Sequence, residues 1–237
     1  MGPIRNFLSL LVIALWTAAC GAAAILTSFF DKSGRAADAI TRNWAGLVAA
    51  LSGLKITVEG AEVVDRNRSY VLVANHRSHL DTIALVLTCP LPLRMLAKAE
   101  LFNIPIFGQA LARVGHLRVD RRQGRTDLTR LGPAVRKMVD AGRTLCVFAE
   151  GSRQPEGAYG EFKRGAFYLA RQNGLPILPV SIVGTGAVLP PKRLRLRPGT
   201  ARLRYHPPIE ISEQNEDELR SQVFEIIRRG GRELERS

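Results

Sequence analysis

The chain has 237 residues, of which 46% are hydrophobic and 6% aromatic, and its formal net charge is +13. This composition excludes a disordered chain and is sufficient for one large α/β domain. The positive charge indicates an anionic partner, and without an RNA-stacking or zinc-finger motif a phosphate-bearing membrane surface is favoured over nucleic acid. The three cysteines lack ligand-like spacing, which predicts buried thiols in a reducing compartment and no metal site.

The N-terminal segment is strongly apolar, since residues 7–30 contain no charged side chain. As one helix they would extend about 36 Å, enough to cross a hydrocarbon core of roughly 30 Å. A hairpin broken near Cys20-Gly21 and a signal peptide are the alternatives. Membrane attachment is the favoured interpretation. It predicts a membrane segment over 1–38 and one globular domain over 39–237.

Basic residues are distributed unevenly around this segment. Arg5 precedes it, whereas Lys32, Arg35 and Arg42 follow it. Because Lys and Arg are enriched on the cytoplasmic side of membranes, the bias predicts a globular domain that faces the cytoplasm.

The rest of the chain alternates between strand and helix patterns. Apolar residues at helical spacing predict helices over 40–51, 82–87, 126–140, 162–172 and 219–227. Alternating or fully apolar runs predict strands over 55–59, 70–74, 94–97, 115–119, 145–148, 177–183 and 201–205. Such alternation predicts a single α/β domain with a mostly parallel mixed sheet flanked by helices. No internal repeat or low-complexity linker suggests a second globular domain.

Polar residues follow three of these strands. Asn75, Arg121 and Glu150 each come just after a strand end. Ligands of parallel sheets bind beyond the carboxyl ends of the strands, so we expect these residues to converge on one site.

The stretch Asn75-His76-Arg77-Ser78-His79-Leu80-Asp81 lies at a predicted strand-to-helix corner. There Asp81 can accept a hydrogen bond from one nitrogen of the His76 imidazole and leave the other nitrogen basic, which is the arrangement of a general base. A structural alternative is that Ser78 caps the helix and Asp81 favours its positive end. Neither interpretation requires a protein nucleophile.

A second block, Phe148-Ala149-Glu150-Gly151-Ser152-Arg153, lacks the G-x-S-x-G elbow, so Ser152 is not a convincing nucleophile. Together with N-H-x-S-x-x-D, the glycine-to-arginine block from Gly115 to Arg121 and Ile177-Leu178-Pro179-Val180, it resembles the lysophospholipid acyltransferase family, specifically its bacterial 1-acyl-glycerol-3-phosphate acyltransferases. The resemblance runs in four ordered blocks from about Leu54 to Ile211.

The resemblance implies that His76 and Asp81 are catalytic and act without metal or cofactor. It also implies that Arg121 and Arg153 hold the acceptor phosphate, that Glu150 positions the glycerol hydroxyls, and that backbone amides near Gly151 stabilise the oxyanion. The implied reaction is acyl transfer from acyl-CoA or acyl carrier protein to the sn-2 hydroxyl of lysophosphatidic acid, forming phosphatidic acid. The implied location is the cell inner membrane.

Two features leave alternatives open. Arg118 stands where the second block usually has an aromatic or aliphatic residue, which leaves room for another acceptor such as a lyso-ornithine lipid. The basic loop Lys192-Arg193-Leu194-Arg195-Leu196-Arg197 is either a solvated face or a contact with an anionic membrane surface. A non-catalytic basic protein that binds membrane surfaces is the alternative from another class.

Overall fold

The structure is a computed structural model that describes residues 2–120, 125–211 and 214–236. Its strands are β1 (Leu54–Glu59), β2 (Val71–Ala74), β3 (Leu93–Lys98), β4 (Leu117–Val119), β5 (Thr144–Phe148), β6 (Ile177–Val183) and β7 (Gly199–Tyr205). Its helices are α1 (Pro3–Thr27), α2 (Arg35–Ser52), α3 (Leu80–Thr88), α4 (Phe107–Val114), α5 (Arg125–Asp140), α6 (Gly165–Asn173), α7 (Thr185–Val188) and α8 (Glu216–Arg236), with 3₁₀ turns η1 (Ala61–Val63) and η2 (Ala99–Asn103).

The strands form one seven-stranded sheet in the order β1-β7-β6-β2-β5-β3-β4. All neighbouring strands are parallel except β6 and β7, which are antiparallel. Every residue of β2 and β6 is buried, as expected for central strands covered on both faces. The predicted α/β domain with a mostly parallel mixed sheet is therefore confirmed.

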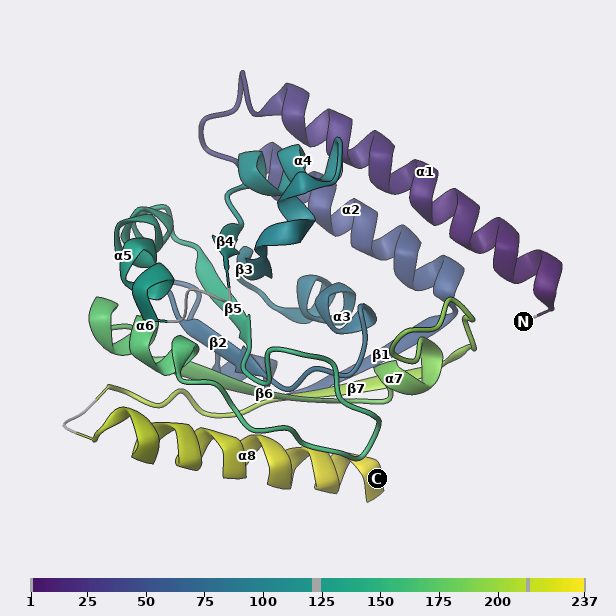
Figure 1. The fold of residues 1–237 in the computed structure, drawn as a ribbon. Coiled ribbons are helices and arrows are strands. Elements are labelled where there is room, and N and C mark those ends of the chain that lie inside the picture. Colours follow the sequence, from purple (N-terminus) through teal and green to yellow (C-terminus); the bar gives the residue numbers. More distant parts are fainter. Residues whose placement is uncertain (1, 121–124, 212–213, 237) are drawn as a thin grey trace.

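The two faces of the sheet carry separate cores, because successive side chains of a strand point to opposite sides. In β2, Leu72 and Ala74 pack with apolar residues of α2 and α3. The alternate residues Val71 and Val73 pack with apolar residues of α5, α6 and α8. Figure 1 shows the same division, with α8 along one face and α3 and α2 on the other.

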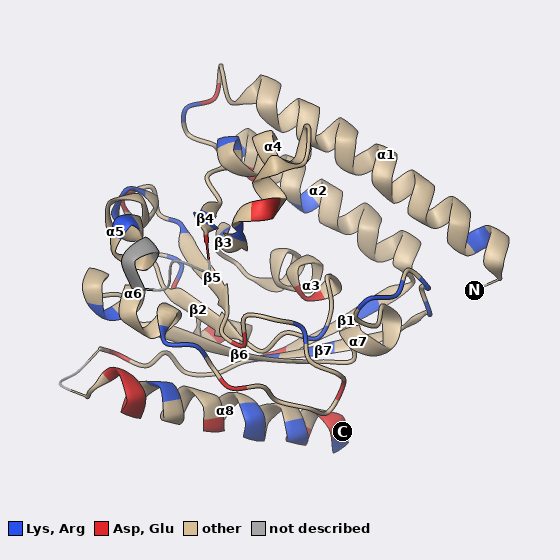
Figure 2. Ribbon diagram, in the orientation of Figure 1, with Lys and Arg blue, Asp and Glu red and all other residues tan. Residues whose placement is uncertain are grey.

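A third layer lies outside α2, where α1 and α4 pack (Figure 1). The indole of Trp44 in α2 donates to the hydroxyl of Thr17 in α1, at 2.9 Å. Gly21 lets α1 approach α4, since a Cβ added there would lie 3.2 Å from the side chain of Ile106. Apart from Arg5, α1 carries no charged residue, and Figure 2 shows it as a long uncharged rod. The exposed apolar side chains of α1 therefore lie on the side of the protein away from the sheet.

Several predicted boundaries move in the structure. Helix α6 begins at Gly165 and not at 162, because the amide of Lys163 donates to the carbonyl of Ala149 and keeps residues 162–164 outside the helix. Helix α5 continues through Pro133 without restarting. Helix α1 is uninterrupted at Cys20-Gly21, where the hairpin alternative placed its break.

Candidate active site

The predicted His–Asp corner is formed. Strand β2 ends at Ala74, α3 begins at Leu80, and the turn between them brings the Nδ1 atom of His76 to 2.7 Å from Oδ2 of Asp81. The Asp81 side chain is fully buried, whereas 17% of the His76 side chain remains exposed. The imidazole is thus held from inside the protein and is accessible from outside it.

The carboxylate of Asp81 accepts hydrogen bonds at both oxygens. Besides the imidazole, Oδ2 accepts from the backbone amides of Arg77, at 2.6 Å, and Ser78, at 2.8 Å. Oδ1 accepts from the hydroxyl of Thr185 at the start of α7. These donors hold the buried carboxylate in one orientation, and its hydrogen bond with the imidazole sets the proton of His76 on Nδ1. The Nε2 atom is then left to act as a base.

Three further contacts fix the histidine turn. The imidazole stacks on the ring of Phe148, with centroids 4.0 Å apart and planes 13° from parallel. The side-chain amide of Asn75 exchanges two hydrogen bonds of 2.8 Å with the backbone of Ile182 in β6. Ser78 donates to the carbonyl of Leu189, at 2.7 Å, and accepts from the amide of Leu80, whereas the N-cap residue of α3 is His79, which makes no side-chain capping bond.

Glu150 is turned toward the backbone of the histidine turn. Its side chain is buried, and its Oε2 and Oε1 atoms accept from the amides of His76, at 2.6 Å, and Gly160, at 2.9 Å. Burial raises the pKa of Glu150, and the two amides act against that shift. These contacts suit a carboxylate that holds the backbone better than one that binds glycerol hydroxyls.

In the turn after Glu150, the amide of Gly151 itself is engaged. Gly151 has a φ of +70°, which favours glycine, and its amide donates to the carbonyl of Phe148 at 3.0 Å. That amide is therefore engaged and is a poor candidate for the oxyanion. The Arg153 side chain is partly exposed and forms no hydrogen bond or ion pair with the described residues. Arg121 lies outside the described residues.

The other three histidines lack the arrangement of His76. His79 is an exposed residue at the start of α3; partial desolvation lowers its pKa, and the charge of Arg153 adds to the effect. His116 is half-buried, accepts from the amide of Met95, and has its pKa lowered by desolvation to about 3. His206 contacts Ser181, whose hydroxyl donates to the carbonyl of Ile227 and is fully buried. That pair is structural.

Sequence reasoning missed two members of the site. Thr185 lies in Gly184-Thr185-Gly186, a stretch too short to match any phosphate-binding pattern, and Phe148 reads as an ordinary residue of a buried strand. Both reach the histidine turn from other strands. The only available signal was that each follows or ends a predicted strand at the same edge of the sheet.

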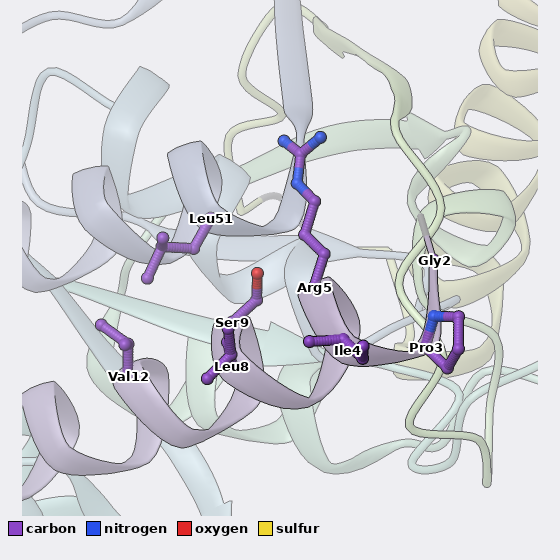
Figure 3. Close-up of a pocket in the computed structure, with 8 residues that line it drawn as sticks. All are labelled: Gly2, Pro3, Ile4, Arg5, Leu8, Ser9, Val12 and Leu51. Carbon is purple, nitrogen blue, oxygen red and sulfur yellow. The ribbon is translucent and has the colours of Figure 1, made fainter.

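Other parts of the surface do not extend the site. The described residues contain no cluster of three or more His, Cys, Asp and Glu suited to a metal ion. A groove lies at the start of α1, between its first turns and the end of α2. It is lined mainly by Ile4, Leu8, Val12 and Leu51 (Figure 3). Arg118, which left other acceptors open, has an exposed side chain on β4.

The chain belongs to the Acyltransferase family, whose model matches residues 55–183, more than half of the 237 residues. This stretch runs from the second residue of β1 to the end of β6 and contains both members of the His–Asp pair. The resemblance noted from the four sequence blocks is confirmed.

Individual relatives are 1-acyl-sn-glycerol-3-phosphate acyltransferases. That of Limnanthes alba is 30% identical over 174 residues, which are 73% of this chain and 61% of the relative. That of Borreliella burgdorferi is 32% identical over 135 residues, or 57% of this chain and 54% of the relative. The chain thus spans less than two thirds of these relatives. The crystal structure of the 1-acyl-sn-glycerophosphate acyltransferase of Thermotoga maritima has a TM-score of 0.85 and 28% identity, covering 99% of this chain and 98% of that one.

Proposed function

We propose that this chain transfers an acyl group from acyl-CoA or acyl carrier protein to the sn-2 hydroxyl of 1-acyl-glycerol-3-phosphate, forming phosphatidic acid. The observation that carries the proposal is the His76–Asp81 pair at 2.7 Å, with one imidazole edge accessible, at the carboxyl edge of the sheet. The acceptor class comes from the named activity of the relatives.

The reaction follows from the state of the imidazole. Nε2 of His76 removes the proton from the acceptor hydroxyl while its oxygen attacks the carbonyl carbon of the thioester. The tetrahedral intermediate then breaks its C–S bond, and the imidazolium returns the proton to the departing thiolate. Asp81 stays ionised throughout and stabilises the imidazolium, as the aspartate of a catalytic triad does. General-base assistance of this kind typically accelerates a reaction about 10²- to 10⁴-fold.

The phosphate of the acceptor would be held by arginine side chains. The Arg153 guanidinium is free of described partners and lies close enough to His79 to lower the pKa of that ring. Arg121 remains the second candidate from the sequence. Within the turn after Glu150, the amides of Ser152 and Arg153 bond no described residue and are the remaining donors for the oxyanion. Glu150 would act by holding the histidine turn in place.

Membrane attachment would be through α1. This helix is long and apolar enough to cross a membrane, and only 17% of its most apolar window is buried in the protein. Its outer face exposes large apolar side chains, including Ile4, Phe7, Leu8 and Leu15. We place the protein at the inner membrane with the catalytic domain on the cytoplasmic side, where acyl thioesters are available.

The test of the function is a panel of acceptors with the purified protein in detergent and a labelled acyl thioester. Lysophosphatidic acid should be acylated at sn-2, and His76→Ala should abolish the product. If a lyso-ornithine lipid is acylated in preference, the acceptor assignment is wrong. If the parent protein acylates neither lipid, a non-catalytic membrane-binding protein becomes the better description.

The same assay tests the role of Arg153. Charge-assisted hydrogen bonds contribute about 1.5–3 kcal/mol, so Arg153→Ala should raise the KM for lysophosphatidic acid roughly 10- to 150-fold and leave the KM for the thioester nearly unchanged. Arg153→Lys keeps the charge without the planar fork and should recover part of the loss. Arg164→Ala, at an exposed arginine paired with Asp217, is the matched control. An unaltered acceptor KM in Arg153→Ala would contradict the assignment.

A further inference from the structure

Arg77, the residue after His76, is a fully buried cation next to the site. Its Nη1 atom donates to the carbonyl of Ala158 and lies 3.7 Å from Oε1 of Glu150. Its guanidinium carbon lies 4.3 Å from the centre of the Tyr159 ring. Arg77 therefore joins the histidine turn to the loop that follows Glu150, from a position that no substrate can reach.

Stability alone is a poor explanation for an arginine at this position. Its Nε and Nη2 atoms are buried and donate no hydrogen bond to the described residues. Burying a charge removes its hydration, and replacing such a group with an apolar side chain of similar volume is often neutral or stabilising. The contacts of Arg77 with the loop after Glu150 therefore explain this residue better than any contribution to the stability of the core.

The loop held by Arg77 controls the main chain of His76. Glu150, whose carboxylate lies next to the Arg77 guanidinium, accepts from the amide of His76 at 2.6 Å and from that of Gly160 at 2.9 Å. From the same loop, the amide of Gln154 donates to the carbonyl of His76 at 2.8 Å. Both backbone groups of the histidine are thus bound to a loop that Arg77 anchors from beneath.

We propose that Arg77 is a positioning residue for the acyl transfer: acting through Glu150 and residues 151–160, it fixes the backbone of His76 and hence the direction of its imidazole. This inference rests on the proposed function and adds to it a residue that touches neither substrate nor Asp81 through its side chain. Displacing a reacting group by about 1 Å can cost as much as 100-fold in rate, so the anchor need move only slightly to matter.

If Arg77 acts through Glu150, the pH dependence of kcat should change when the charge of Arg77 is removed. Burial raises the pKa of Glu150, while the amides of His76 and Gly160 and then the charge of Arg77 oppose the rise. The other titratable groups that face Arg77 and Glu150 are the imidazole of His76 and the phenol of Tyr159. The charge of Glu235 also raises the pKa of Tyr159. Glu156 binds the amide of Gly184 nearby.

Removing the charge of Arg77 raises the pKa of Glu150 further. Only the ionised carboxylate accepts at both oxygens, so the contribution of Glu150 is present above its pKa and is lost as the pH falls through it. In a variant without the cation, that loss therefore begins at a higher pH.

The experiment measures kcat and both KM values from pH 5.5 to 9 for the full-length protein in detergent. Arg77→Met should lower kcat at pH 7 about 10- to 100-fold with both KM values nearly unchanged, and should move the acid limb of kcat to higher pH. Arg77→Lys should restore most of the rate and the position of the limb. Arg77→Gln, which keeps a donor but not the charge, gives the same test if the methionine variant does not fold. Arg164→Met, at an exposed arginine in the N-cap position of α6, is the control.

Coupling through Glu150 is tested in a Glu150→Gln background. There Arg77→Met should change kcat by less than about twofold and should no longer move the acid limb, because both variants act through one group. A folded Arg77→Met or Arg77→Gln protein with the parent kcat and pH profile would overturn the proposal. So would full additivity with Glu150→Gln.

Amide hydrogen exchange tests the anchoring role of Arg77 independently of the proposed acyl transfer. In Arg77→Met the amides of residues 76–81 and 158–160 should exchange faster than in the parent protein, whether or not any acyl transfer is detected. Unchanged exchange there refutes the anchoring role. A parent protein that transfers no acyl group refutes the proposed reaction and leaves the exchange result to decide the role of Arg77.

Discussion

Asp81 shows how a single residue organises this site. It is fully buried and accepts from the imidazole, from two backbone amides of its own turn and from Thr185, which is distant in sequence. A buried carboxylate needs such donors, because an uncompensated charge in the interior is costly. The same bonds that stabilise Asp81 therefore orient His76.

Substitutions of His76 and Asp81 test the assignment of the base. His76→Ala should lower kcat by at least about 100-fold while the protein stays folded, since general-base assistance is of that order. Asp81→Asn should also lose most turnover, because the imidazole loses its anionic partner. His79→Ala is the control and should be far milder. Rates in detergent and circular dichroism spectra provide the check, and a His76→Ala rate above about a tenth of the parent would contradict the base assignment.

The hydrogen bond from Thr185 to Asp81 can be removed with little change of shape. Thr185→Val keeps the shape of the side chain and removes one hydrogen bond to the buried carboxylate, so it should reduce the free energy of unfolding by about 1.5–3 kcal/mol. We also expect kcat to fall roughly tenfold, because Asp81 is less firmly held. Thr57→Val, at an exposed threonine of β1, is the matched control. Equal stability and rate for the two variants would show that the Thr185 contact contributes nothing.

Helix α1 is bound to the catalytic domain at both ends. Near its start, Asn6 donates to the carbonyl of Leu194, at 3.0 Å, and accepts from the amide of Leu196, at 2.8 Å. Just beyond its other end, the carbonyl of Ser33 accepts from Arg143, at 2.8 Å. Because one folded domain holds both ends of α1, we expect the helix to lie in a membrane surface and not to cross it.

We therefore predict the sidedness of α1. Cysteines introduced at Gly2 and at Ser33, in a Cys20→Ala background, should both react with a membrane-impermeant thiol reagent in inverted inner-membrane vesicles. The remaining cysteines, Cys89 and Cys146, are buried and should stay unlabelled. Labelling at Ser33 alone, with Gly2 protected until detergent is added, would show instead that α1 crosses the bilayer.

For the whole molecule, the distribution of charge matters more than its sum of +13. The basic loop 192–197 is attached to α1 through Asn6, and its Leu194 is 73% exposed. Helix α8, which also carries many charges, covers the opposite face of the sheet (Figure 2). A membrane surface that accepts α1 would meet the basic loop and not α8.

This arrangement predicts salt-dependent binding to anionic vesicles. Replacing Lys192, Arg193 and Arg195 with Gln should weaken binding by up to about 100-fold at low salt, since each basic residue near an anionic surface contributes about 1 kcal/mol. The same replacement of Arg229, Arg232 and Arg236 on α8 should have little effect. Co-sedimentation at rising ionic strength checks both, because screening over about 10 Å at 0.1 M should remove the difference. Equal loss in the two triple variants would contradict a specific role for the loop.

Local pattern determined much of this protein. The periodicities at 70–74, 145–148 and 177–183 are properties of neighbouring residues, and they predicted buried parallel strands because such strands must be apolar on both faces. The five-residue separation of His76 and Asp81 is likewise local, so the turn and the pair could be predicted from the sequence.

The tertiary structure decided everything that depends on the order of strands in the sheet. Only the placement of β5 and β6 beside β2 brings Phe148 and Thr185 to the histidine turn. It also turned Glu150 inward, because the amides of His76 and Gly160 come together there, and it buried Arg77 beneath the same loop. Contacts between residues about 100 positions apart leave no periodicity in a single sequence. The sequence therefore determined the His76–Asp81 pair, and the fold determined what holds that pair in place.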